Sequence, residues 1–201
     1  MTYKDELIRA MNLLGSRENV LFVGQNVLYG GTSMYHTFKH LPREKMIELP
    51  VFEEIQAGIC TGLALLGFLP VSIYPRMDFL ILALNQIVNH LDKAEAMSDG
   101  AFKPKVIVRT AIGSTNPLMP GPQHCQDHTE ALKLMCSNMN VVKLRSADMV
   151  YPEYERALRS DKSTILVEIP DLYNKDLEKE LKESRKNSSF RNDKSFQDKI
   201  E

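Results

Sequence analysis

Residues 48–74 read ELPVFEEIQAGICTGLALLGFLPVSIY, and this stretch decides what kind of fold the chain can adopt. Its first half, after the carboxylates Glu53 and Glu54, is rich in Ala and Gly, which permit close packing against another backbone. Its second half, residues 70–74, is a short apolar run of the kind that forms a buried strand. A close-packing helix that leads into a buried strand is typical of an α/β protein.

The same alternation continues on both sides of this stretch. The hydrophobic pattern predicts helices at residues 3–14, 79–97, 129–137 and 152–159, and strands at residues 19–23, 105–110, 141–144 and 163–169. Nearly all-apolar strands separated by helices indicate a mostly parallel sheet with helices on both faces. We therefore expect a doubly wound α/β fold.

Length and composition limit the organisation and location of the protein. The chain has 201 residues, of which 43% are hydrophobic, and its formal net charge is −1. We expect one α/β domain at residues 1–173 and a charged helical or disordered tail at residues 174–201. A net charge so close to zero does not favour binding to nucleic acid or to an anionic membrane. Three cysteines without CxxC spacing and the absence of an apolar leader or span predict a cytoplasmic protein.

Several common chemistries are missing from the sequence. Residues 23–35 read VGQNVLYGGTSMY, which contains neither of the glycine patterns that cradle nucleotide phosphates. No GxSxG motif is present. His124 and His128 have i, i+4 spacing beside Cys125, but no further ligands follow at suitable spacing, so we assign no metal site.

Four segments, taken together, carry a more specific signal. They are residues 48–74, PRMDFLILALNQIVNHL (75–91), KVIVRTAIGS (105–114) and GPQHCQDHTEALK (121–133). In this order and with this spacing they resemble the pyrimidine-binding domain of thiamine-diphosphate enzymes. The likeness is greatest to β subunits of 2-oxoacid dehydrogenases, with the transketolase central domain a step further away, and it covers residues 19–173. It implies the thiamine-diphosphate-binding fold.

The resemblance implies roles for four residues, and a fifth candidate departs from the family pattern. Glu53 occupies the position of the family's catalytic glutamate, and Phe79 is the first candidate to contact the cofactor ring, with Tyr74 second. His124 matches the active-site histidine of the family. Arg76 departs from the neutral residue that is usual in this turn, so we expect it to bind an anionic group of the substrate.

These residue types suit the chemistry that the family implies. The cofactor deprotonates its own thiazolium C2 through its 4′-nitrogen, which requires a carboxyl group at N1′, here Glu53. An aromatic wall such as Phe79 positions the ring and excludes water. His124 could protonate the alkoxide that forms as the carbonyl is attacked. The carbanion chemistry itself belongs to the cofactor.

The family also implies a partner, because its diphosphate is held through Mg²⁺ by a GDG motif in another domain. Residues 98–100, Ser-Asp-Gly, lack the first glycine of that motif. We therefore expect an α-type partner subunit that carries the motif, an α2β2 heterotetramer, and a 2-oxo acid or ketose substrate cleaved or joined next to its carbonyl. The apolar helix at residues 79–97 is the expected subunit contact, with Ile87 as the position to test.

Other interpretations remain open at this stage. Phe79 and Tyr74 could be core aromatics, His124 an ordinary loop residue, and Arg76 half of a surface salt bridge. For the whole chain the alternatives are a transketolase-like carboligase subunit, a non-catalytic regulatory or scaffold module, and a flavodoxin-like domain that binds another small ligand.

Overall fold

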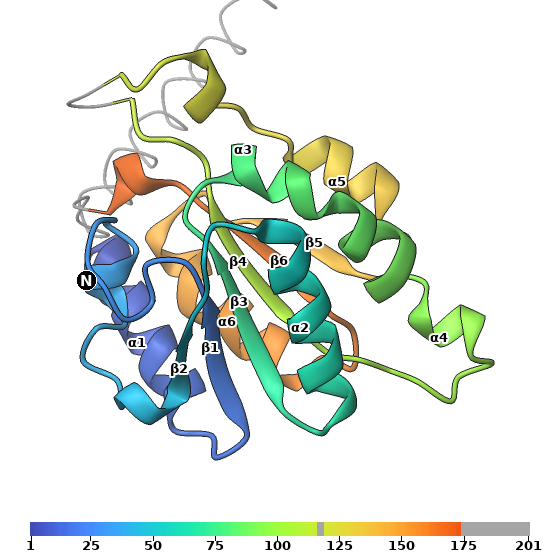
Figure 1. The fold of residues 1–201 in the computed structure, drawn as a ribbon. Coiled ribbons are helices and arrows are strands. Elements are labelled where there is room, and N and C mark those ends of the chain that lie inside the picture. The colour runs from blue at the N-terminus through green and yellow to red at the C-terminus, as the bar shows by residue number, and fades with distance from the viewer. Residues whose placement is uncertain (116–118, 174–201) are drawn as a thin grey trace, which may run out of the picture.

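A computed structural model describes residues 1–115 and 119–173 of the chain. Its centre is a six-stranded, fully parallel sheet with the strand order β2-β1-β3-β4-β6-β5. The strands are β1 (Val20–Gly24), β2 (Met46–Glu48), β3 (Leu69–Tyr74), β4 (Ile107–Ala111), β5 (Asn140–Lys143) and β6 (Thr164–Glu168). The doubly wound α/β fold predicted from the alternation is confirmed (Figure 1).

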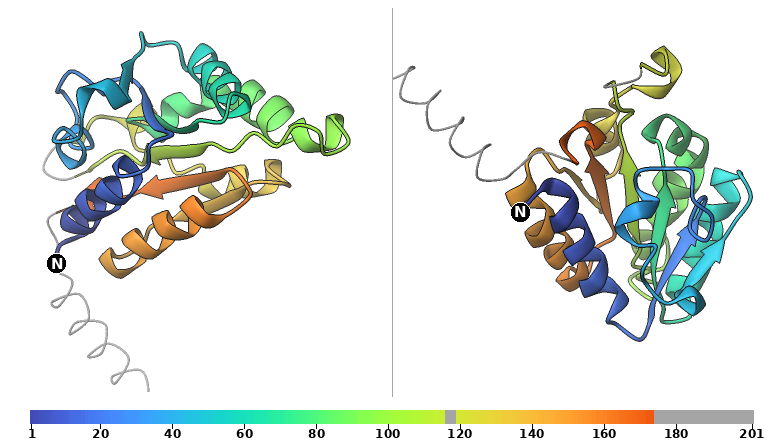
Figure 2. Two further views of the ribbon diagram at one scale, coloured as in Figure 1. Left: turned by 90° about the horizontal axis from the view of Figure 1, so that it is seen from below. Right: turned by 90° about the vertical axis from the view of Figure 1, so that its left-hand side faces the viewer.

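Helices cover both faces of the sheet, as Figure 2 shows from two sides. The α-helices are α1 (Tyr3–Gly15), α2 (Glu53–Leu65), α3 (Met77–Leu80), α4 (Ala94–Met97), α5 (Thr129–Met135) and α6 (Ala147–Arg159). The shorter 3-10 turns are η1 (Tyr35–Thr37), η2 (Arg43–Lys45), η3 (Ile81–Ala83), η5 (Pro122–His124) and η6 (Pro170–Leu172), and η4 (Asn85–Leu91) is a π-helix. The helices α1 and α6 pack together on one face, and α2, the segment from α3 to η4, and α5 cover the other.

Each face of the sheet has its own hydrophobic core. The core beneath α1 and α6 includes Phe22, Val71 and Tyr154, all fully buried. The opposite core joins α2 and the α3–η4 segment to the sheet through residues such as Ala57 and Ile165. Strands buried on both faces explain why their sequences are continuous apolar runs and not alternating ones.

A buried ion pair crosses the first of these cores. Arg109 on β4 and Glu168 on β6 are both fully buried, with Nε and Oε1 2.5 Å apart. The hydroxyls of Tyr154 and Tyr173 also donate to the Glu168 carboxylate, at 2.6 and 2.5 Å. Burial alone would lower the pKa of Arg109, but the adjacent Glu168 raises it overall, so the guanidinium remains charged. Each buried charge is therefore compensated.

The structure corrects two local predictions and adds one strand that was not predicted. The edge strand β2 was not predicted, because three residues are too few to show a period. The last long helix begins at Ala147, not at residue 152, and Pro152 lies inside it. The single helix expected at residues 79–97 is instead a series of α, 3-10, π and α segments between Met77 and Met97.

Two further points concern the limits of the chain. Among residues 1–115 and 119–173, no helix is long and apolar enough to cross a bilayer. The charged tail predicted at residues 174–201 lies outside the described residues.

The strand order determines where a ligand can bind. From β1 the chain moves to the edge strand β2, and then crosses back to the other side of β1 to form β3. The connections that leave β1 and β3 therefore run in opposite directions, which opens a crevice at their carboxyl ends. Those ends are Gly24 and Tyr74, and α2 begins above them.

Candidate functional site

Glu53 is the first residue of α2 and lies at this switch point. Its side chain is buried, with 3% of its surface exposed, and its Oε1 accepts a hydrogen bond of 3.0 Å from the Gln25 amide. Gln25 follows directly after β1 and is itself buried. The carboxyl group thus has a defined position in a largely dry environment, where hydrogen bonds and charges act more strongly than in water.

Tyr74 ends β3 and holds the backbone of the same residue. Its hydroxyl donates to the main-chain carbonyl of Glu53 at 3.3 Å, and its ring is almost completely enclosed. Burial raises the pKa of Tyr74 far above its ordinary value, so the hydroxyl stays a neutral donor. The hydroxyl of Tyr74 therefore holds the backbone of Glu53, and the ring of Tyr74 packs in the core.

Phe79 and His124 form a second pair. Their rings meet edge to face, with centroids 5.5 Å apart and an interplanar angle of 87°. Both side chains are partly exposed. The structure therefore brings together two residues that are 45 positions apart in the sequence.

The loop that carries His124 is held from two sides. On one side the Asp78 carboxylate accepts hydrogen bonds from the main-chain and side-chain nitrogens of Gln126, at 3.2 and 3.1 Å. On the other side, a Cβ at Gly113 would lie only 1.6 Å from the His124 carbonyl oxygen. Glycine at this position is what allows the loop to pass so close to the end of β4.

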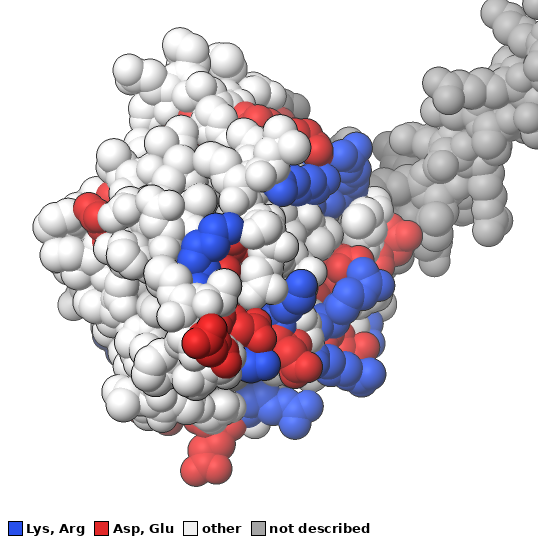
Figure 3. Space-filling model, turned by 90° about the vertical axis from the view of Figure 1, so that its right-hand side faces the viewer, with Lys and Arg blue, Asp and Glu red and all other residues white. Residues whose placement is uncertain are grey.

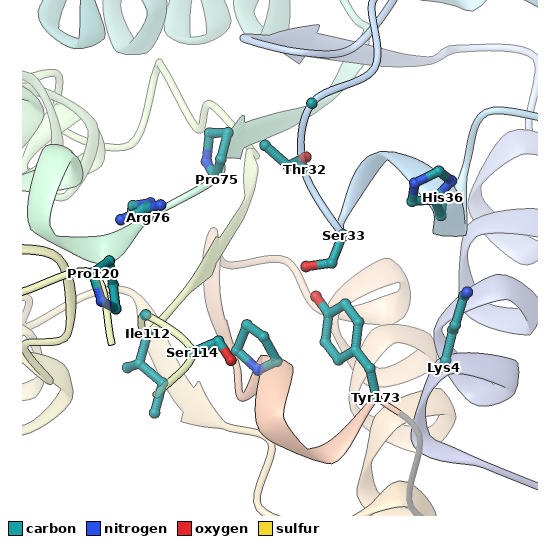
Figure 4. Close-up of a pocket in the computed structure, with 13 residues that line it drawn as sticks. Lys4, Thr32, Ser33, His36, Pro75, Arg76, Ile112, Ser114, Pro120 and Tyr173 are labelled. Carbon is teal, nitrogen blue, oxygen red and sulfur yellow. The ribbon is translucent and has the colours of Figure 1, made fainter. Parts of the chain in front are cut away.

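Arg76 lines a separate cavity of about 450 Å³ beside these pairs. Figure 4 shows Arg76 and Pro120 on one side of the cavity, and Lys4 and His36 on the other. No Asp or Glu belongs to the lining formed by the described residues, and Arg76 has no ion-pair partner among them. One guanidinium nitrogen of Arg76 is buried and has no hydrogen-bond acceptor in the part of the chain that the structure describes. Such a group favours an anionic ligand.

The predicted site residues therefore fall into three groups. Glu53 and Tyr74 are in contact, Phe79 and His124 are in contact, and Arg76 lines a cavity whose wall does not include the other four. The segment from Tyr74 to Phe79 joins the groups along the chain.

Several contributing residues were missed from the sequence. They are Gln25, Glu48, Asp78, Gly113, Lys4 and His36. Glu48, Asp78 and Gly113 lie within the segments that carry the resemblance, but the local sequence shows the role of none of the six, because each acquires it through a contact with a distant part of the chain. Only Asp78, which lies next to Phe79, was close enough to a predicted site residue to have been considered.

A parallel sheet whose switch point holds a buried, hydrogen-bonded carboxyl group defines a ligand-binding domain of the doubly wound class. The family model for the transketolase pyrimidine-binding domain matches residues 1–175, and the chain belongs to this family. Membership implies thiamine diphosphate as the cofactor.

Curated relatives agree with this assignment. The chain is 28% identical over 179 residues to the mitochondrial pyruvate dehydrogenase E1 component subunit beta of Caenorhabditis elegans, covering 86% of this chain and 49% of that protein. It is 29% identical over 164 residues to the chloroplastic subunit beta-3 of Arabidopsis thaliana, covering 78% of this chain and 38% of that protein. The chain therefore spans about half or less of the length of these relatives.

A solved structure supports the fold. The chain superposes on a split-gene transketolase, described as an inactive beta4 tetramer, with a TM-score of 0.62 and 15% sequence identity. The match covers 83% of this chain and 50% of that one.

The relatives correct one prediction. The cytoplasmic location expected from the cysteines and the amino-terminal sequence is contradicted, because related subunits are named mitochondrial or chloroplastic. Unpaired cysteines indicate only a reducing environment and do not identify the compartment.

Proposed function

We propose that this chain is the pyrimidine-binding, β-type subunit of a two-subunit thiamine-diphosphate enzyme, and that residues 1–173 are its pyrimidine-binding domain. The reaction would cleave or form a carbon–carbon bond next to a carbonyl group, as in 2-oxoacid dehydrogenases. The observation that carries this proposal is Glu53, buried at the switch point with one carboxylate oxygen held by Gln25.

Glu53 and Phe79 would together hold the cofactor's pyrimidine ring. Glu53 would hydrogen-bond the ring nitrogen N1′, and Phe79 would supply an apolar wall beside the ring. Tyr74, whose hydroxyl bonds the Glu53 carbonyl, would keep the carboxylate in place. When bound, the cofactor supplies the nucleophilic carbon that attacks the substrate carbonyl.

His124 would serve the substrate side of the site. Its imidazole lies against Phe79, at the edge of the wall assigned to the cofactor. An imidazole at this position can give a proton to the substrate oxygen as negative charge develops on it. Gly113 and Asp78 would keep the histidine loop at the distance that this transfer requires.

Arg76 would bind an anionic group of the substrate. The cavity that it lines also presents Lys4, beside His36, on the opposite side, so a carboxylate or phosphate could meet the two cations Arg76 and Lys4 from both sides. A 2-oxo acid and a phosphorylated ketose both carry such a group, and therefore both substrate classes belong in the test below.

The diphosphate and Mg²⁺ would be held by an α-type partner that carries a GDG motif. The two chains would form an α2β2 heterotetramer that is active only when both are present.

An exposed apolar surface supports the need for a partner. Four side chains are 41% to 63% exposed: Phe52 just before α2, Ile55 on α2, and Ile81 and Leu82 on η3. Figure 3 shows that much of the face on this side of the molecule carries no charged side chains. Such patches mark association surfaces.

Substitution of Glu53 tests the proposal, with Glu54 as the matched control. Glu54 is the next residue of α2 and is hydrogen-bonded to the amide of Asn85. We expect Glu53→Gln, assayed with the partner, thiamine diphosphate and Mg²⁺, to lower turnover by about 100-fold or more. Glu54→Gln should stay within about twofold, since it leaves the ring nitrogen's partner intact.

The substrate panel should contain 2-oxo acids and phosphorylated ketoses. Turnover of the ketoses alone would favour the transketolase-like carboligase.

Arg76→Gln should raise KM for the anionic substrate and leave cofactor affinity unchanged. Full activity of Glu53→Gln would refute the mechanism, and cofactor-dependent activity of the partner without this chain would favour the regulatory or scaffold module.

A further inference from the structure

The residue that bonds the Glu53 carboxylate is presented by an unusually constrained turn after β1. Gly24 ends the strand with a φ of +149°, and a Cβ there would lie 2.4 Å from the Ile73 carbonyl oxygen. The amide of Gln56 donates to the same carbonyl oxygen, at 2.9 Å. The end of β1 is thus pressed against β3, and the direction in which the chain leaves the strand is fixed.

The next residues are held by a single carboxylate. Glu48, at the end of β2, accepts hydrogen bonds from the main-chain nitrogens of Asn26, Val27 and Leu28 at 2.8, 2.7 and 2.7 Å. Asn26 adopts a φ of +54°, a conformation that costs energy in a non-glycine residue and persists where surrounding contacts require it. Consecutive nitrogens around one carboxylate make the turn rigid.

Gln25 lies between these two constraints. Its side chain is 8% exposed, and its amide reaches the Glu53 Oε1 at 3.0 Å. The NH₂ group of a glutamine amide is neutral, so it can donate to this oxygen both when the carboxyl group is ionised and when the other carboxyl oxygen carries a proton. Leucine could bond neither form, and lysine would add a positive charge that favours the ionised carboxylate. A neutral donor of this kind suits a carboxyl group that shares a proton with its ligand.

We propose that Gln25 is the positioning residue of Glu53. It keeps one carboxyl oxygen bonded in both protonation states and leaves the other oxygen for the cofactor's ring nitrogen. The Glu48-bound turn holds Gln25 in place for this task. This inference rests on the proposed function of Glu53, and it assigns to residue 25 a role that its position in the sequence does not suggest.

A double-mutant cycle on cofactor affinity tests the assignment. The variants are Gln25→Leu, Glu53→Gln and the double variant, each combined with the partner subunit and titrated calorimetrically with thiamine diphosphate and Mg²⁺. Gln25→Leu should weaken binding about tenfold, because a buried hydrogen bond to a charged group is lost. In the Glu53→Gln background the same change should have no further effect, since the two residues act as one unit.

Gln86→Leu, on η4, is the matched control and should bind thiamine diphosphate as the wild type does.

The outcomes separate this inference from the proposed function. Wild-type affinity in Gln25→Leu, or an equal loss in both backgrounds, would overturn the positioning role while leaving Glu53 as the cofactor's partner. Wild-type affinity and activity in Glu53→Gln would instead refute the proposed function. If Gln25→Leu does not fold, Gln25→Met replaces it, because methionine keeps the unbranched shape without the amide.

Discussion

Single atoms decide the geometry around His124. The carbonyl oxygen of His124 occupies the space where Gly113 would carry a Cβ, so any other residue at position 113 must displace the loop. The loop in turn places the imidazole against Phe79. The distance between His124 and Phe79 therefore depends on Gly113, just after β4, having no side chain.

Replacement of Gly113 by alanine should move the histidine loop. We expect Gly113→Ala to destabilise the chain by about 1–3 kcal/mol, as overpacking does. Turnover with the partner should fall at least about tenfold, since small misplacements of a catalytic group are costly. Thermal unfolding and the reconstituted assay measure the two effects.

Gly62 provides the control for this change. It lies within α2, and a Cβ there would meet nothing within 4 Å. Gly62→Ala should therefore stabilise the chain by about 0.5–1 kcal/mol through helix propensity, without loss of activity. Equal behaviour of the two alanine variants would contradict the account of the histidine loop.

At the scale of elements, the segment between Met77 and Met97 departs most from its sequence pattern. Its apolar spacing predicts one helix, but the chain forms a π-helix from Asn85 to Leu91 between shorter helical turns. The π-helix ends next to Asp92, whose carboxylate accepts hydrogen bonds from the main-chain nitrogens of Ser137 and Asn138, at 3.2 and 2.7 Å. A buried side chain thus fastens this segment to the turn before β5.

Asp92 should make stability depend on acid. Burial would raise its pKa, but the hydrogen bonds from Lys93, Asn138 and Ser137 outweigh burial and lower the pKa below its usual range. A lowered pKa in the folded state contributes stability that is present above the unfolded value of about 4 and is lost as the pH falls through the folded value.

Substitution of Asp92 by asparagine tests this dependence. We expect Asp92→Asn to lose about 1–3 kcal/mol at pH 7, because an amide replaces one carboxylate oxygen with a donor that faces donors. The difference from the wild type should shrink below about pH 4 in denaturant unfolding. Asp99→Asn, at an exposed turn, is the control and should change stability by less than about 0.5 kcal/mol at either pH. A difference that stayed constant with pH would count against the ionised role of Asp92.

At the scale of the whole molecule, one face of the α3–η4 segment packs against the core and the other is exposed. Ile87 is 1% exposed and belongs to the core between this segment and the sheet. A charge at Ile87 would therefore unfold the chain. For this reason the position cannot test a subunit contact, although the sequence suggested that it could. Leu82 is 63% exposed and faces outward, so it is the position that reports on association.

A charge at Leu82 should weaken assembly and leave folding intact. We expect Leu82→Glu to keep the wild-type unfolding temperature, since the side chain has few internal contacts to lose. It should weaken binding to the α-type partner about tenfold or more in analytical ultracentrifugation, because the interface would bury an unpaired charge. Ile87→Glu, by contrast, should unfold. Unchanged assembly by Leu82→Glu would direct the search for the interface to another face.

The sequence by itself determined the class of fold and supplied the first candidates for the site. Apolar runs separated by helical patterns required a parallel sheet, because only strands covered on both faces can bury such runs. The four segments around Glu53, Phe79 and His124 identified the family, which the match over residues 1–175 confirms. These signals are local, so they can be recognised from short stretches of sequence.

Only the tertiary structure decided how the site is held together. Gln25 meets Glu53 across 28 positions, Glu48 holds the turn that begins 22 residues earlier, and Lys4 and Arg76 line one cavity from opposite parts of the chain. The π-helix and the edge strand β2 were also unpredictable. The physical reason is shared: these contacts depend on strand order, register and crossovers, which bring distant residues within hydrogen-bond distance and leave no periodic pattern in the sequence.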